Sequence, residues 1–236
     1  MSWSSERLTP HASPVLVIAH RGASAHEHEN SLAAFRAAVR LGADGIELDI
    51  HDTADGAIVV HHDPSLDGRP IRQLSVAVVS RHRLPNGEVV PTLPEALATI
   101  GPNCRVFVEV KTLAPEHDGA LFGVLDSGPA PSNYHVHGFD HRIVRRLTAQ
   151  RPGLVGGVLS RSYPVDPWRQ VSDVGAQELW QETPLIDRAL VAGAHERGFR
   201  VYAWTVDAPA RARELAAMGV DGVCTNRPDV IREALA

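Results

Sequence analysis

Residues 15–50 read VLVIAHRGASAHEHENSLAAFRAAVRLGADGIELDI, and this stretch holds one complete structural unit. The apolar run 15–19 is typical of a buried strand. A helical pattern follows it, and Asn30 or Ser31 is suited to cap that helix. Residues 45–50 then form a second apolar run. A strand, a helix and a second strand in this order predict two parallel strands joined by a crossover helix.

The same unit recurs along the rest of the chain. Further strands are predicted at 105–110, 134–137, 154–159, 174–177 (a weak pattern), 200–204 and 219–225. Helical patterns occupy 94–100, 141–150, 184–197 and 209–218. Eight strands that alternate with helices in 236 residues predict an α/β fold, the (β/α)8 or TIM barrel. We expect one domain, 1–236, with its core at about 15–230. A doubly wound open sheet is the alternative.

The segment after the second strand breaks this alternation. Ala54-Asp55-Gly56 is a turn signal, and the apolar run 57–61 follows it without a helix. This pattern predicts a small β-hairpin excursion that is not part of the barrel. A turn near Asp55 would place residue 63 opposite residue 47. Residues 63–92, rich in Pro and Gly, are predicted to be loop.

Composition excludes several classes of protein. The formal net charge of −5 provides no basic surface for nucleic acid, and no apolar run is long enough to span a bilayer. Residues 1–10 lack the apolar core of a secretory signal. Two scattered cysteines, Cys104 and Cys224, are expected to be small buried residues in a reducing compartment. We therefore expect a cytoplasmic protein, and the sequence carries no signal for its oligomeric state.

Glu47 and Asp49 are two residues apart in a predicted strand, so their carboxylates point to the same face. Burying two carboxylates together is unfavourable unless a positive charge compensates them. A hard cation such as Mg²⁺ or Ca²⁺ would do so, and so would salt bridges to Arg or Lys. Glu109 adds a third carboxylate at the end of another strand. Lys111 is suited either to pair with these carboxylates or to contact a phosphate.

Two histidines complete the pattern. His20, followed by Arg21, ends the first strand, and the carboxyl ends of barrel strands form the active face. The hairpin would bring His62 back beside Glu47, whereas His61 is expected to be solvated. Two histidines beside a phosphate provide an acid and a base, which phosphodiester cleavage requires. Arg21 is suited to bind phosphate in a bidentate manner.

Eight motifs in series carry a resemblance to a known family. They are His20-Arg-Gly22, Glu29-Asn30-Ser31, Glu47-Leu-Asp49, Asp55-Gly56, His62-Asp63, Glu109-Val-Lys111, Ala203-Trp-Thr-Val206 and Thr225-Asn-Arg-Pro-Asp229. In order and spacing they resemble the glycerophosphodiester phosphodiesterase family, from about residue 15 to 230. The resemblance implies a TIM barrel and a divalent metal ion, Ca²⁺ or Mg²⁺, with Mn²⁺ as a further option.

The resemblance also implies roles for individual residues. Glu47, Asp49 and Glu109 correspond to the metal ligands, and His20 and His62 to the general base and general acid. The substrate-binding residues would be Arg21, Lys111, Trp204 and Phe139, with Glu29 at the edge of the site. His28 replaces the family's usual proline, and the loop at Asp67-Gly68-Arg69 is shorter than usual.

The expected reaction is hydrolysis of a small glycerophosphodiester to glycerol 3-phosphate and an alcohol such as choline or ethanolamine. Attack either by the glycerol 2-hydroxyl, giving a cyclic phosphate, or by water fits this chemistry. A phospholipase D-like lyase that acts on choline lipids is one alternative; the low aromatic content of 5% does not favour the apolar rim that it would need. A barrel that only senses a phosphorylated ligand is another.

Overall fold

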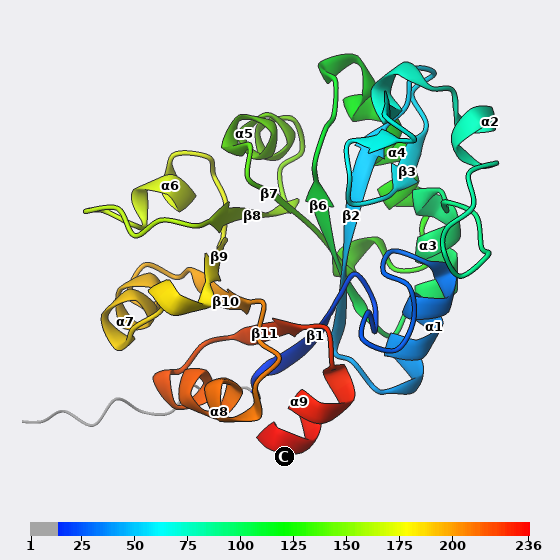
Figure 1. Ribbon diagram of the computed structural model, residues 1–236. Coiled ribbons are helices and arrows are strands. Elements are labelled where there is room, and N and C mark those ends of the chain that lie inside the picture. Colours follow the sequence, from blue (N-terminus) through cyan, green and yellow to red (C-terminus); the bar gives the residue numbers. More distant parts are fainter. Residues whose placement is uncertain (1–13) are drawn as a thin grey trace, which may run out of the picture.

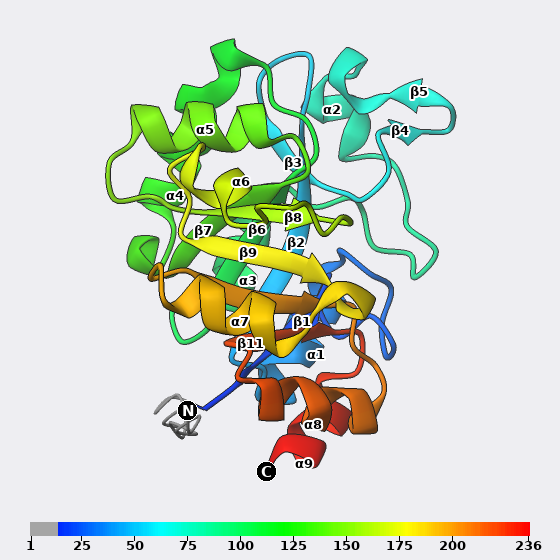
Figure 2. The same ribbon diagram turned by 90° about the vertical axis from the view of Figure 1, so that its left-hand side faces the viewer.

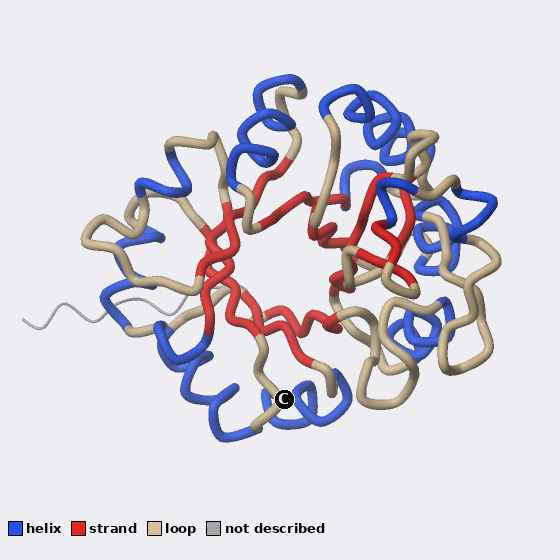
Figure 3. Tube along the Cα trace, turned by 45° about the horizontal axis from the view of Figure 1, so that its top comes forward, coloured by secondary structure: helices blue, strands red, loops and turns tan. Residues whose placement is uncertain are grey.

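Eight parallel strands close into a barrel in the computed structural model, which describes residues 14–236. The strands are β1 (Leu16–His20), β2 (Gly45–Asp52), β6 (Arg105–Val110), β7 (Tyr134–Gly138), β8 (Val155–Ser160), β9 (Glu178–Glu182), β10 (Arg200–Trp204) and β11 (Gly222–Thr225). Strand β1 pairs in parallel with both β2 and β11, which closes the ring seen in Figure 3. The predicted TIM barrel is confirmed and the open sheet was wrong. The prediction about residues 1–10 lies outside the described residues.

Helices cover the outside of this ring (Figure 1). They are α1 (Leu32–Arg40), α3 (Leu93–Ile100), α4 (Asp118–Ser127), α5 (His141–Gln150), α6 (Arg169–Ser172), α7 (Arg188–His195), α8 (Pro209–Met218) and α9 (Pro228–Leu235), with short 3₁₀ turns at Pro115–His117, Pro131–Asn133 and Thr183–Leu185. Ser31 caps α1 by accepting a hydrogen bond from the Ala34 N–H. Helix α4 was not predicted, because Gly119 and Gly123 weaken its helical pattern. None of the helices in residues 14–236 is long and apolar enough to cross a membrane.

An aromatic cluster fills the inside of the barrel. The Phe107 ring lies 5.0 Å from that of Trp180 and 5.4 Å from that of Tyr202, in edge-to-face contacts. These side chains are fully buried, together with Ile18. Residues two positions further along a strand share the same face, so the next inward side chains lie nearer the carboxyl ends. The cluster therefore forms a floor beneath the residues that follow it.

Strand β9 is displaced from its predicted position. Residues 174–177 were expected to form a strand, but the strand is Glu178–Glu182. Residues 174–177 instead continue from α6 through a turn at Gly175, whose φ is +65°. Two buried polar residues, Glu178 and Gln181, interrupt the apolar pattern of β9. That interruption is why an apolar run pointed to the wrong segment.

The predicted hairpin is present after β2. Strand β3 (Ile58–Val60) pairs antiparallel with β2, with Ile50 opposite Val60. Continued in this register, residue 47 lies opposite residue 63, as predicted. Strand β3 pairs with β2, and its Val59 also forms an isolated antiparallel bridge with Thr92; both contacts leave β3 outside the ring of eight parallel strands.

The expectation of loop for residues 63–92 was wrong. This segment contains β4 (Ser65–Leu66), β5 (Arg69–Pro70), a 3₁₀ turn (Ile71–Gln73) and α2 (Val76–Val79). Its buried apolar side chains pack with Val59 of β3 into a small separate core, which contains Leu66, Ile71, Leu74, Val79, Leu84 and Val90. Each element is too short to show a period in the sequence. Figures 1 and 2 place this excursion beside the barrel, next to the β2–β3 hairpin.

Candidate active site

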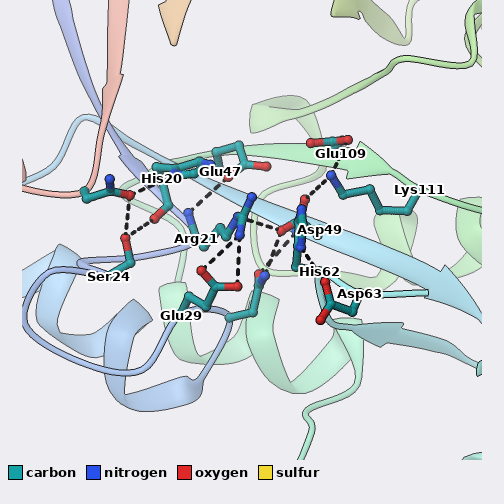
Figure 4. Close-up of polar contacts among 12 residues, drawn as sticks. His20, Arg21, Ser24, Glu29, Glu47, Asp49, His62, Asp63, Glu109 and Lys111 are labelled. Carbon is teal, nitrogen blue, oxygen red and sulfur yellow. Dashed lines mark hydrogen bonds and ion pairs between the residues drawn. The ribbon is translucent and has the colours of Figure 1, made fainter. Parts of the chain in front are cut away.

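A single open pocket at the carboxyl ends of the strands collects most of the predicted site residues. Its lining includes His20, Arg21, Glu47, His62, Glu109, Lys111, Phe139 and Trp204. The pocket has a volume of about 180 Å³ and is open to solvent. Asp49 and Glu29 both contact the guanidinium of Arg21 (Figure 4). Segments from residue 20 to residue 204 therefore meet at one place.

Asp49 is fully buried but has compensating charges. Its Oδ1 lies 3.0 Å from Lys111 Nζ, and its Oδ2 lies 3.1 Å from Arg21 Nε. The Asn30 side-chain amide also donates to Oδ2 at 2.7 Å. Burial raises the pKa of Asp49, but the cations of Lys111 and Arg21 outweigh it and the net pKa is lowered. Of the two carboxylates Glu47 and Asp49, Asp49 therefore has the salt bridges to Arg and Lys that were considered as an alternative to a metal ion.

Glu47 and Glu109 are compensated less well. Glu47 Oε2 accepts a hydrogen bond from the backbone N–H of Arg21 at 3.0 Å, and Glu109 Oε1 lies 2.6 Å from Lys111 Nζ. Burial, followed by the charge of Asp49, raises the pKa of Glu47 to about 7 and that of Glu109 to about 8. Two buried carboxyls with raised pKa values favour a further positive charge close to them.

Lys111 and Arg21 stay charged in this environment. Burial lowers the pKa of Lys111, but the carboxylates of Asp49 and Glu109 outweigh it and the net pKa is raised. Arg21 Nη1 donates to both oxygens of Glu29 at 2.9 Å, in addition to its contact with Asp49. Both cations line the pocket while they neutralise carboxylates. The position of Lys111 is therefore compatible both with pairing to the carboxylates and with contact to a phosphate.

The backbone that presents Arg21 is a tight turn in the left-handed region. Arg21 has a φ of +56°, and Gly22 has a φ of +82°. A Cβ at Gly22 would lie 2.7 Å from the Ala34 backbone carbon, so only glycine fits against α1. The close approach of this turn to α1 fixes the direction in which His20 and Arg21 enter the pocket.

His20 has a set of supporting residues that the sequence interpretation missed. Its Nδ1 lies 2.7 Å from Asn226 Oδ1. The Asn226 side-chain amide donates to Asp207 Oδ2 at 2.7 Å, and Ser24 Oγ donates to Asn226 Oδ1 at 2.8 Å. Asn226 Oδ1 is thus an acceptor, so the neutral His20 ring has its proton on Nδ1 and its lone pair on Nε2. Asn226 belongs to the Thr225-Asn-Arg-Pro-Asp229 motif, and this motif was the sequence feature that could have indicated its role beside His20.

His62 lies at the end of the hairpin, where the register predicted it. Its Nδ1 lies 2.9 Å from Asp63 Oδ1, and this hydrogen bond lowers the pKa of Asp63. The His62 carbonyl oxygen lies 3.3 Å from Nε2 of the buried His51. His62 lines the pocket and His61 does not. The preference for His62 over His61 therefore agrees with the geometry.

An aromatic corner forms the opposite wall. The rings of Phe139 and Trp204 lie 5.6 Å apart, edge to face, and Trp204 Nε1 donates to the Trp180 carbonyl. The guanidinium of Arg161 lies 5.1 Å from the Phe139 ring and 5.3 Å from the Trp204 ring. Arg161 was not predicted, because it follows β8 with no motif around it. His137 on β7 also lines the pocket and was missed; strand alternation through 134–137 was the signal for it.

The sequence of this chain matches a known protein family. The family model described as "Glycerophosphoryl diester phosphodiesterase family" matches residues 20–230. The chain belongs to this family. The predicted class of enzyme, a phosphoric diester hydrolase, is thereby confirmed.

Individual members of the family resemble the chain over nearly its whole length. A glycerophosphodiester phosphodiesterase from Caldanaerobacter subterraneus subsp. tengcongensis is 32% identical, over 92% of this chain and 96% of that protein. A probable glycerophosphodiester phosphodiesterase 2 from Mycobacterium tuberculosis is 32% identical, over 93% of this chain and 90% of that protein. The fold matches that of an Oleispira antarctica phosphodiesterase, solved with the product sn-glycerol-3-phosphate, with a TM-score of 0.86 and 24% identity over 93% and 96% of the two chains.

Proposed function

We propose that this protein hydrolyses small glycerophosphodiesters to sn-glycerol 3-phosphate and a free alcohol, with the help of a divalent cation. The observation that carries the proposal is the convergence of His20, His62, Glu47 and Glu109 on one pocket. Membership of the family and the product bound to the Oleispira relative support the same reaction. The buried, unpaired Cys104 and Cys224 support action in a reducing compartment, the cytoplasm.

The buried carboxylates fit a hard divalent cation. Glu47 and Glu109 have raised pKa values because they are buried with too little positive charge, and a cation would supply it. We assign Glu47, Asp49 and Glu109 as the carboxylate ligands, with Ca²⁺, Mg²⁺ or Mn²⁺ as the ion. A bound cation would polarise the phosphoryl group and neutralise its charge.

His20 is the proposed general base. In the neutral imidazole, an Nδ1–H that donates to Asn226 leaves the lone pair on Nε2 to take a proton from the attacking oxygen. His62 is the proposed general acid, which gives a proton to the oxygen of the leaving alcohol. Asp63 accepts a hydrogen bond from Nδ1 of His62 and holds its ring in place.

The remaining residues bind and orient the substrate. Lys111 and Arg21 would stabilise the charge that builds on the phosphoryl oxygens in the transition state. Phe139 and Trp204 would pack against the carbon chain of the glycerol group. Glu29 holds Arg21 in position through the bidentate ion pair at the edge of the pocket.

Analysis of the products by ³¹P NMR tests this function. Purified enzyme with Mg²⁺, Ca²⁺ or Mn²⁺ should convert glycerophosphocholine or glycerophosphoethanolamine to sn-glycerol 3-phosphate. A transient cyclic phosphate signal would identify the glycerol 2-hydroxyl as the nucleophile, whereas direct attack by water would give no such signal. Cleavage of choline-lipid vesicles in preference to soluble diesters would instead indicate the lyase. No turnover with any of the three metals would indicate the sensor.

A further inference from the structure

His137 is a buried histidine whose ring nitrogens lack ordinary partners. It lies on β7 with 1% of its surface exposed and faces the pocket beside Glu47 and Glu109. Within residues 14–236, its Nδ1 has no hydrogen-bond partner. Its Nε2 lies 3.9 Å from Glu47 Oε1, too far for a hydrogen bond. Burying a polar group without a hydrogen-bond partner is unfavourable unless something else binds it.

The preceding inward residue of the same strand shows the usual arrangement. His135 is also buried, and its Nδ1 lies 2.7 Å from Glu178 Oε1. His137 instead contacts the Trp180 ring in a T-shaped arrangement, with 4.3 Å between the ring centroids. Packing alone therefore explains the position of His137 but leaves its nitrogens unused.

One ring nitrogen of His137 lies where a ligand of the proposed cation would lie. Glu47, Glu109 and His137 each offer one ligand atom, and these three atoms lie within 4.8 Å of one another. Two atoms bound to one ion at about 2.1–2.4 Å are separated by at most about 4.8 Å. We propose that His137 is a protein ligand of the divalent cation, and that it adds a nitrogen donor to the carboxylates. This inference rests on the metal dependence in the proposed function.

An imidazole nitrogen among the ligands would bias the choice of metal. A neutral imidazole is a ligand of intermediate softness, which suits Mn²⁺, Co²⁺ and Zn²⁺ better than Mg²⁺ or Ca²⁺. The chain should therefore prefer a transition metal over Mg²⁺ more strongly than an all-carboxylate site would.

Metal binding to the metal-stripped protein tests this ligand without using activity. Isothermal titration calorimetry would give the dissociation constants of Mn²⁺ and Mg²⁺ for wild type, His137→Gln and His135→Gln. His137→Gln should weaken Mn²⁺ binding at least about tenfold and Mg²⁺ binding much less. His135→Gln, whose ring is bonded to Glu178, should leave the ratio of the two constants unchanged. Equal losses for both metals, or none, would overturn the proposal.

Pulsed EPR of the Mn²⁺-loaded protein provides a second measurement, which does not depend on whether the variant folds. Wild type should show a ¹⁴N coupling from a directly bound imidazole, and His20→Gln and His62→Gln should retain it. A wild-type spectrum without ¹⁴N coupling would contradict the proposal even if the enzyme is active with Mn²⁺. In that case the metal-dependent function would stand and only the His137 ligand would fail. Absence of any metal binding would instead contradict the proposed function itself.

Discussion

His20 Nδ1 and Asn226 Oδ1 lie 2.7 Å apart, although 206 residues separate them in the chain. Asn226 is held in turn by Asp207, which accepts hydrogen bonds from its backbone N–H at 2.8 Å and from its side-chain amide at 2.7 Å. The last barrel strand thereby orients the histidine that ends the first one. This orientation selects the His20 tautomer that has its free nitrogen on Nε2.

Replacing Asn226 should impair turnover without removing a group that touches the substrate. Asn226→Ala frees the His20 ring, and misplacing a catalytic group by about 1 Å costs on the order of 10²-fold in rate. Steady-state kinetics should show a fall of this size in kcat/KM, with unchanged Mn²⁺ affinity. Ser24→Ala removes the hydrogen bonds from Ser24 Oγ to Asn226 Oδ1 and to the His20 carbonyl oxygen, but it leaves the bond between His20 and Asn226 and should cost less. Equal kinetics for Asn226→Ala and wild type would contradict the positioning role.

Substitution of His20 or His62 should have a much larger effect than substitution of His61. His20→Ala and His62→Ala should each lower kcat by about 10²–10⁴-fold, because each removes a general acid or base. His61→Ala is the matched control: it changes the residue next to His62, outside the pocket, and should stay within a few-fold of wild type. A His62→Ala enzyme as active as His61→Ala would show that the assignment of the acid is wrong.

The arrangement of strands was accessible from the sequence because alternation along a strand fixes which side chains share a face. This alternation placed Glu47, Asp49 and Glu109 on one face, and the register of the hairpin favoured His62 over His61 as the histidine beside them. It did not show which carboxylates are already neutralised. That depends on where the long side chains of Arg21 and Lys111 end, and this is set by packing.

Contacts between segments that are distant in the chain could not be predicted from the sequence patterns either. The pairing of His20 with Asn226 requires the barrel to close, and no local period reports it. His137 was visible as part of a strand, but its role emerges only from the lack of a partner for its ring. The core of 63–92 is built from elements of two to four residues, which are too short to leave a periodic signal.

Gly22 should be less tolerant of substitution than other glycines with positive φ. Gly22→Ala adds a Cβ at 2.7 Å from Ala34, whereas Gly68→Ala adds one with no atom within 4 Å, and the two φ angles are similar at +82° and +75°. Left-handed backbone costs about 1–2 kcal/mol at either position, and overpacking adds about 1–3 kcal/mol at Gly22 only. Urea unfolding should resolve the difference. Equal midpoints for the two variants would show that the turn at Gly22 can relax.

Asp52 should make stability depend on pH in the acid range. It accepts hydrogen bonds from the Ala114 N–H, His117 Nδ1 and Thr112 Oγ1 at 2.9–3.0 Å. Burial raises its pKa, but these bonds outweigh burial and the net pKa is lowered. The carboxylate therefore contributes stability above its unfolded pKa of about 3.9, which is lost as the pH falls through the lower folded value.

Asp52→Asn should remove this contribution. At pH 7 the variant should be less stable than wild type by about 1–3 kcal/mol, because hydrogen bonds to a charged group are lost. The difference should shrink as the pH falls below about 4. Urea unfolding from pH 3 to 7 provides the measurement. A difference that stays constant across this range would show that the charge of Asp52 does not stabilise the hairpin.

The central claim is that a divalent cation on the buried carboxylates enables His20 and His62 to cleave a glycerophosphodiester. Its most direct test is release of sn-glycerol 3-phosphate from glycerophosphocholine and glycerophosphoethanolamine by metal-stripped enzyme, titrated with Mn²⁺, Mg²⁺ or Ca²⁺. We expect no turnover in EDTA, saturable recovery with metal for at least one diester, and no recovery for Glu47→Gln or Glu109→Gln. Full activity in excess EDTA, or full recovery of both variants, would contradict the account.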